Sequence, residues 1–146
     1  MDTYIKKGLQ WGLAGTLGMT ILMLIGTALK LSPMPAPVPV ALAKLILGDV
    51  PKPVLMITGM LSHFLYGGIA GIIFSKFLKE KVSIVKGLAW GAILWLAMQL
   101  IFLPILCWGI FGTNISAKIA VVTLVLHLIY GGILGGGIYW KQKQNE

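Results

Sequence analysis

The chain contains no arginine, only four acidic residues and a single cysteine among its 146 residues. Without arginine, a surface that reads DNA bases or clamps phosphates is not expected. The acidic residues Asp2, Asp49, Glu80 and Glu146 all lie outside the long apolar stretches, so no carboxylate inside a membrane can couple protons to a substrate. None of them forms a pair suited to acid–base hydrolysis. The lone Cys107 cannot form a disulfide within the chain.

Apolar residues dominate what is present. Hydrophobic residues make up 58% of the chain, charged residues 11%, and the mean hydropathy is +0.92, which is outside the balance of a soluble domain. Four apolar stretches, at about 8–31, 54–77, 87–111 and 117–140, each reach the roughly 20 residues that a helix needs to cross a bilayer. We therefore predict an all-α integral membrane four-helix bundle that forms one transmembrane domain over residues 1–146.

The lysines predict how this bundle is oriented. Eight of the twelve lysines fall on one side of the membrane, in the two termini and in the loop between the second and third helices. Because lysine is retained on the cytoplasmic side, both termini are expected to be cytoplasmic, in the cytoplasmic (inner) membrane of a prokaryote. The net charge of +8 is then explained by this orientation and by attraction to anionic lipids. The lipid bilayer is a predicted partner and nucleic acid is not.

Two short motifs occur twice. "KGLQWG" at 7–12 returns as "KGLAWG" at 86–91, and "HFLYGGIAG" at 63–71 returns as "HLIYGGILG" at 127–135. The first pair is separated by 79 residues and the second by 64. Each unit holds an even number of spans, so the pattern predicts two tandem helical hairpins with the same orientation, related by an axis along the membrane normal.

Repeat 1, about 1–80, and repeat 2, about 81–146, differ mainly in the first loop. That loop, residues 30–53, exceeds its counterpart by about fifteen residues (79 minus 64). Its proline-rich beginning is expected to be extended, and residues 40–47 are expected to form a short interfacial helix. The loop is either a simple connector or a lid or docking site for a partner.

The only two histidines share one setting. His63 and His127 each lie about nine or ten residues into a helix that runs inward, which places both about 14 Å below the outer boundary. Tyr66 and Tyr130 flank them on the same helix faces. The residues four and eight positions after each histidine are Gly67, Gly71, Gly131 and Gly135. Thr20 and Gln99, which are 79 residues apart, complete a predicted thin polar layer with the histidines.

Three interpretations of this layer stay open. The glycines can be packing tracks between the second and fourth helices, with hydrogen bonds from the histidines, or faces that bind other membrane subunits or a second copy. A haem b can lie between His63 and His127 as axial ligands, with the macrocycle against Gly67, Gly71, Gly131 and Gly135. A small permease can use the polar layer as a path. No catalytic residue is predicted, because no carboxylate is available to orient either histidine as a base.

A resemblance covers nearly the whole chain. In order, "MTILML", "LSPMPAPVP", "SHFLYGGIAG", "KGLAWGAILWLAMQL" and "LHLIYGGILGG" resemble a family of small, uncharacterised prokaryotic four-helix membrane proteins and, more distantly, the YagU-type inner-membrane proteins. The resemblance implies a four-helix membrane fold and no established activity. The positions that it carries over are His63, Gly67, Gln99, His127 and Gly131.

From these observations we expect a small noncatalytic membrane protein. The first hypothesis is a redox-associated or accessory subunit that binds one haem b between His63 and His127, which are the only metal ligands predicted. The alternative is a cofactor-free packing or assembly subunit of a membrane complex, and the third hypothesis is a small permease.

Overall fold

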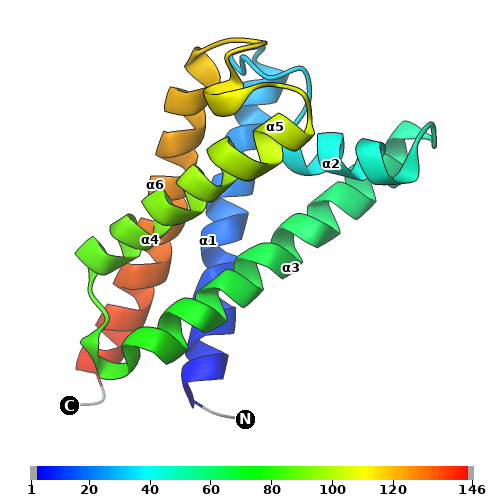
Figure 1. The fold of residues 1–146 in the computed structure, drawn as a ribbon. Helices are drawn as coiled ribbons and strands as arrows, with labels where there is room; N and C mark the ends of the chain where they lie inside the picture. Colours follow the sequence, from blue (N-terminus) through cyan, green and yellow to red (C-terminus); the bar gives the residue numbers. More distant parts are fainter. Residues whose placement is uncertain (1–2, 145–146) are drawn as a thin grey trace.

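The computed structural model describes residues 3–144, and these form helices and connecting loops without a β-strand (Figure 1). Three helices are long and continuous: α1 (Thr3–Ala28), α3 (Lys52–Leu78) and α6 (Lys118–Lys143). A fourth long segment joins α4 (Ile84–Ala97), the π-helical turn η2 (Met98–Phe102) and α5 (Leu103–Ile105). The shorter elements are α2 (Val38–Leu47), η1 (Lys79–Lys81) and η3 (Ile110–Gly112). The predicted all-α four-helix bundle is confirmed.

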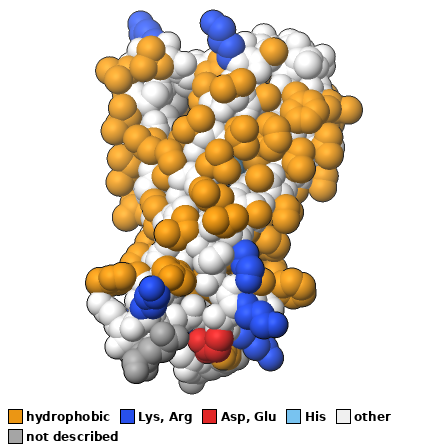
Figure 2. Space-filling view, turned by 90° about the vertical axis from the view of Figure 1, so that its left-hand side faces the viewer, with side chains coloured by type: hydrophobic (Ala, Val, Ile, Leu, Met, Phe, Trp, Pro, Cys, Tyr) orange, Lys and Arg blue, Asp and Glu red, His pale blue; other side chains and the backbone are white. Residues whose placement is uncertain are grey.

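Four segments are long and apolar enough to cross a membrane: Thr3–Ala28, Lys52–Lys81, Ile84–Ile105 and Lys118–Lys143. Each exceeds the roughly 20 residues that a spanning helix needs. Figure 2 shows hydrophobic side chains over the middle of one face of the molecule, with lysines toward both ends. By length and composition, this is a multi-pass membrane protein.

The third span ends earlier than the sequence predicted. A helix over about 87–111 was expected, but the helical segment ends at Ile105, and Gly109 then adopts a positive φ of 76°. Pro104 explains the irregularity, because its ring would collide with the carbonyl four residues earlier in an α-helix. The π turn widens the helix at this point, and the Leu103 N–H donates to the Met98 carbonyl five residues back.

Glycines hold α1 against α3. A methyl group at Gly71 would collide with the carbonyl oxygen of Gly8, and a methyl group at Gly67 would collide with the Thr16 side chain. Gly12 in turn faces the backbone of Gly67 and Gly71. The two backbones therefore meet directly along this face, as small residues allow in membrane helices.

The same arrangement holds α4 against α6. Methyl groups at Gly131 and Gly135 would collide with the backbone of Gly87, and one at Gly91 with the carbonyl of His127. The expectation that the glycines would pair the second and fourth spans is wrong. They pair the first span with the second and the third with the fourth, because glycines occur on both members of each of these pairs.

The first hairpin (α1 and α3) and the second hairpin (α4 and α6) meet at two interfaces. The interface between α1 and α6 is tight. The Tyr130 ring of α6 lies on Gly15 of α1, and the Trp11 ring of α1 lies on Gly137 of α6. Ile133 contacts Gly18 in the same interface. Large side chains on one helix thus occupy the space above glycines on the other, and α1 and α6 pack along much of their length.

The other contact, between α3 and α4, is open. The offsets of 79 and 64 residues match Gly15 to Leu94 of α4 and Gly137 to Ile73 of α3. Leu94 is buried, so its side chain takes up space that Gly15 leaves to the neighbouring helix in the tight interface, whereas Ile73 is 52% exposed. The extensive contacts of α3 are with α1 and α2 instead, and α3 has few contacts with α4.

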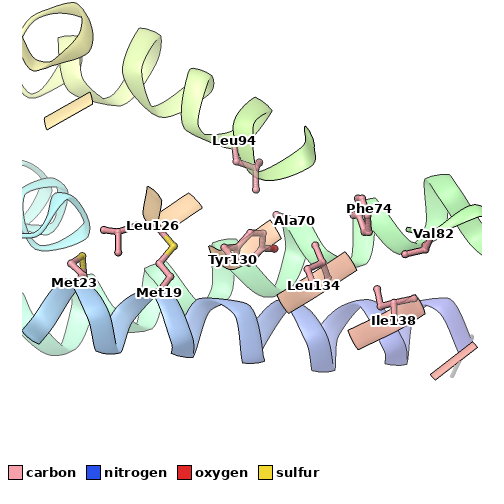
Figure 3. Packing of buried hydrophobic residues seen from close by; sticks show 10 residues of the cluster. All are labelled: Met19, Met23, Ala70, Phe74, Val82, Leu94, Leu126, Tyr130, Leu134 and Ile138. Carbon is pink, nitrogen blue, oxygen red and sulfur yellow. The ribbon is translucent and has the colours of Figure 1, made fainter. Parts of the chain in front are cut away.

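Buried side chains from all four spans fill the centre of the bundle (Figure 3). This cluster consists of Met19, Met23, Ala70, Phe74, Val82, Leu94, Leu126, Tyr130, Leu134 and Ile138. Phe74 and Trp90 form an aromatic contact between α3 and α4, with 6.0 Å between ring centroids.

Two adjacent glycines allow a matched test of the backbone contacts. We expect Gly131→Ala to lower the free energy of unfolding by about 1–3 kcal/mol, the usual cost of overpacking, because its methyl group would collide with the Gly87 carbonyl. Gly132→Ala should leave stability unchanged or slightly raised, because the nearest atom to its methyl group, Leu88 Cδ2, is 3.6 Å away. Equilibrium unfolding in mixed micelles measures both. Equal effects of the two substitutions would contradict the packing.

Candidate ligand-binding pocket

A partly open cavity of about 340 Å³ lies between α3 on one side and, on the other, Leu94 of α4 with Met98 and Phe102 of η2. Side chains of α1 and α6 form its back, and α2 covers its outer end. Its wall is mainly apolar and includes four methionines, Met19, Met23, Met34 and Met98. The volume falls within the roughly 300–1,000 Å³ of small-molecule sites, and the apolar wall with a few polar groups is typical of them.

The first loop supplies the outer wall. Residues 40–47 were expected to be a short helix, and α2 is found over Val38–Leu47. It packs against α3 where the backbone of Pro39 and Val40 meets Gly59, and it presents Leu42 and Ala43 to the cavity. The loop therefore does more than connect two spans, because it forms one side of the pocket.

The two histidines lie together at this pocket. His63 of α3 and His127 of α6 both line the large cavity, and both also line a second cavity of about 20 Å³ beside it. Tyr66 and Tyr130 line the small cavity as well. A space of this size is enough for one water molecule. The two histidines and two tyrosines that were singled out from the sequence thus surround the same small cavity.

A backbone hydrogen bond fixes the ring of His127. Its Nδ1 lies 2.8 Å from the carbonyl oxygen of Thr123, one turn earlier in α6. A carbonyl oxygen only accepts hydrogen bonds, so Nδ1 carries the proton and donates. In the neutral ring, Nε2 is then an acceptor with a free lone pair, and it makes no hydrogen bond to the described residues. The His127 side chain is buried, with 7% of the residue exposed.

His63 has a nitrogen without a partner. Its Nε2 is buried and forms no hydrogen bond with the part of the chain that the structure describes. A buried polar atom without a partner costs free energy, and such atoms are uncommon in folded proteins. His63 and His127 line the same two cavities, and each has an Nε2 atom without a hydrogen bond to the described residues.

The predicted polar layer divides into two parts. Gln99, which is fully buried, donates from Nε2 to the Thr123 hydroxyl at 2.8 Å. Thr123 therefore connects Gln99 to His127, through its hydroxyl on one side and its carbonyl on the other. Thr20 is also buried, but its hydroxyl has no partner among the described residues, and it does not line either cavity.

The two tyrosines have different roles. The Tyr130 hydroxyl donates to the carbonyl oxygen of Gly67 at 2.7 Å and so connects α6 to α3. Tyr66 is 41% exposed, and its ring meets Phe102 of the π turn edge-on, with 6.2 Å between centroids. Tyr66 and Phe102 both line the large cavity, so this contact joins its two side walls.

The four glycines predicted to contact a cofactor lie against neighbouring helices, although Gly67 also lines the small cavity beside the histidines. Gly67 and Gly71 are covered by α1, and Gly131 and Gly135 are covered by α4. Those faces cannot also support a flat macrocycle, and they are equally closed to a helix of another subunit. The prediction that these glycines border a cofactor is therefore corrected: their role is to pack helices together.

Sequence reasoning missed three features of the pocket. Thr123 was not singled out, although its position four residues before His127 predicts contact on the same helix face. Leu94 was also missed, although the offset of 79 residues relates it to Gly15 and so shows a leucine in place of a glycine. The methionine-rich wall was not recognised, because its residues come from three segments: Met19 and Met23 from α1, Met34 from the first loop and Met98 from η2.

Charged groups lie away from the pocket. No charged residue lines the cavity among residues 3–144, and the same residues contain no cluster of three or more His, Cys, Asp or Glu side chains placed to hold a metal ion. Glu80 lies in η1 and accepts a hydrogen bond from Tyr4, and Asp49 lies 4.0 Å from Lys44 beyond α2. Asp2 and Glu146 lie outside the described residues.

The fold and the pocket define a small multi-pass membrane protein with an apolar cavity between two hairpins. The chain belongs to a family of unknown function (DUF6789), whose model matches residues 3–146. This agrees with the resemblance to an uncharacterised family. No curated protein and no solved structure matches the chain.

Proposed function

We propose that this protein binds a lipophilic small molecule in the cavity between α3 and α4 and that it has no catalytic activity of its own. The observation that carries the proposal is an apolar cavity of about 340 Å³ whose wall includes the buried His127 and the half-buried His63, each with an unpartnered ring nitrogen. Apolar surface would hold the body of the molecule, and a few converging polar groups would orient it.

The scarcity of contacts between α3 and α4 supports entry of the molecule from the bilayer. A lipophilic molecule is concentrated among the lipid chains, and the gap between these helices would open to them. Tyr66 and Phe102 meet across the two side walls, so a change in their contact would widen the gap. α2 covers the end of the cavity nearest the membrane surface in the expected orientation.

The absence of catalysis is proposed from the chemistry of the pocket wall. A histidine that acts as a general base is usually oriented by a carboxylate. The described residues that line the cavity include no aspartate or glutamate, and the proton on His127 is directed to a backbone carbonyl. Binding, rather than bond cleavage, is the role that these groups support.

We also propose the cytoplasmic membrane as the location, with both termini in the cytoplasm. Lysines are concentrated at the termini and around η1, which lie at one end of the bundle (Figures 1 and 2). Lysine-rich flanks are retained on the cytoplasmic side. This orientation places α2 and the outer end of the pocket on the opposite side of the membrane.

We interpret the two hairpins as a tandem repeat. The Gly8–Gly71 contact of the first hairpin corresponds to the Gly87–Gly135 contact of the second, under the offsets of 79 and 64 residues. This correspondence supports the interpretation that the repeated motifs serve the same packing role twice.

Haem b is the second candidate occupant. The donor set fits in part, because His63 and His127 each have an unpartnered ring nitrogen and line the same cavities. The four glycines that were to border the macrocycle do not fit, since helices cover them. If haem were bound, His63 and His127 would be its axial ligands, and it would supply one-electron chemistry.

Filling the pocket tests the main proposal. We expect Thr58→Trp, at a pocket-lining position of α3, to displace the occupant. Ile57→Trp is the matched control, because Ile57 is 62% exposed and does not line the cavity. The measurement is mass spectrometry of organic extracts from protein purified in mild detergent.

A lipophilic compound should be present at about one per chain in the unmodified protein and in Ile57→Trp, and should be lost from Thr58→Trp. Extracts with the same composition from both variants would contradict the proposal. A folded protein without any such compound would favour the assembly-subunit alternative.

An absorption spectrum separates haem from other occupants. Protein from haem-replete cells should show sharp bands after dithionite reduction if haem is bound, and both His63→Ala and His127→Ala should lose them, because bis-histidine ligation needs both rings. A colourless, folded protein would eliminate haem and leave the lipophilic occupant.

The orientation is tested with the single native cysteine. Cys107 is exposed beyond the third span, so a membrane-impermeant maleimide should label it from outside intact spheroplasts. The matched control is Gln144→Cys in a Cys107→Ser background, which should react only after the membrane is opened. The reverse pattern would show that the termini are external.

A further inference from the structure

We propose that the occupant carries a hydroxyl group that lies between His127 and His63. This inference rests on the proposed function, because it specifies the head group of the molecule held in the pocket between α3 and α4. The inference follows from the hydrogen-bonding roles that the protein leaves unfilled at these two rings.

His127 offers a hydrogen-bond acceptor. Its Nδ1–H is directed to the Thr123 carbonyl at 2.8 Å, so its Nε2 has only a lone pair to offer. A doubly protonated ring would place a positive charge in a wall whose described residues include no carboxylate, which is unfavourable. The neutral ring therefore accepts at Nε2, and an occupant that donates there would pair it.

His63 can supply the complementary donor. Its Nε2 is buried and has no partner in the part of the chain that the structure describes, and no protein hydrogen bond fixes which of its ring nitrogens carries the proton. With the proton on Nε2, this ring donates. The pair then offers one donor and one acceptor beside the same cavity.

A hydroxyl group matches this pair, because it donates one hydrogen bond and also accepts. A ketone or an ether accepts from His63 but leaves the Nε2 lone pair of His127 unpaired. A carboxylate would bring a charge into a wall where the described residues include no lysine, at a high cost of desolvation. The geometry therefore favours a neutral alcohol or phenol.

The rest of the wall favours a long flexible body. Met19, Met23, Met34 and Met98 line the cavity, and unbranched thioether side chains adapt to irregular apolar shapes. The head group would lie beside the histidines, where α3, α6 and the small cavity meet, while the apolar chain would extend past these methionines toward α2. A lipophilic alcohol with a prenyl-type chain has this distribution of polar and apolar surface.

The test compares two probes that differ only at the head group. The full chain in nanodiscs is titrated with tritiated geranylgeraniol and with its methyl ether, which retains the oxygen but cannot donate. We expect the alcohol to bind about tenfold more tightly, the factor that corresponds to one hydrogen bond. In His127→Phe, both probes should bind with the affinity of the ether. Thr58→Trp should bind neither.

A second measurement does not depend on a variant that folds. In protein labelled with ¹⁵N-histidine, unprotonated ring nitrogens give a separate resonance, and that of His127 is identified by through-space contacts of its ring with Thr123. The alcohol should shift this resonance, since it donates to Nε2, and the methyl ether should not.

The outcomes separate the inference from the proposed function. If both probes bind equally well and neither moves the His127 resonance, the hydroxyl inference is overturned and the lipophilic pocket stands. If neither probe binds and extracts contain no other lipophilic compound, the proposed function fails as well. A tighter complex with the ether would overturn the assignment of His127 Nε2 as the acceptor that selects the head group.

Discussion

Direct contact between glycine backbones is the constraint on which the rest of this structure depends. In lipid, burial of apolar surface does not drive helices together, so close van der Waals packing must do so. Gly8 with Gly71, and Gly87 with Gly135, bring α1 to α3 and α4 to α6. Each hairpin thereby becomes one closely packed unit, and the fold is completed by the way in which the two hairpins meet.

The pocket arises because the two interfaces between the hairpins are unequal. Gly15 accepts the Tyr130 ring and Gly137 accepts the Trp11 ring, so α1 and α6 pack closely on that side. On the other side the buried Leu94 stands at the position that corresponds to Gly15, and its side chain lines the cavity of about 340 Å³.

The long apolar runs made the number of spans and the helical bundle predictable. The two histidines, which were predicted to lie at one depth, both line the pocket. The pairing of helices was not predictable, because a glycine shows that something approaches closely but not which neighbour does. The early end of the third span depends on the π turn that the backbone forms before Pro104. The spacing of apolar residues does not reveal such a turn. Thr123 acts through its carbonyl as well as its hydroxyl, and a backbone group has no signature in the sequence.

The uncharged wall of the cavity has a consequence for energetics across the membrane. The transmembrane potential acts on formal charge, at about 2.3 kcal/mol per elementary charge for each 100 mV. No charged side chain among the described residues lines the cavity, and the neutral occupant that we propose would bring none. Entry and departure of such a molecule would therefore move no net charge through the field, so its occupancy would follow its concentration in the bilayer whether the membrane is energised or not.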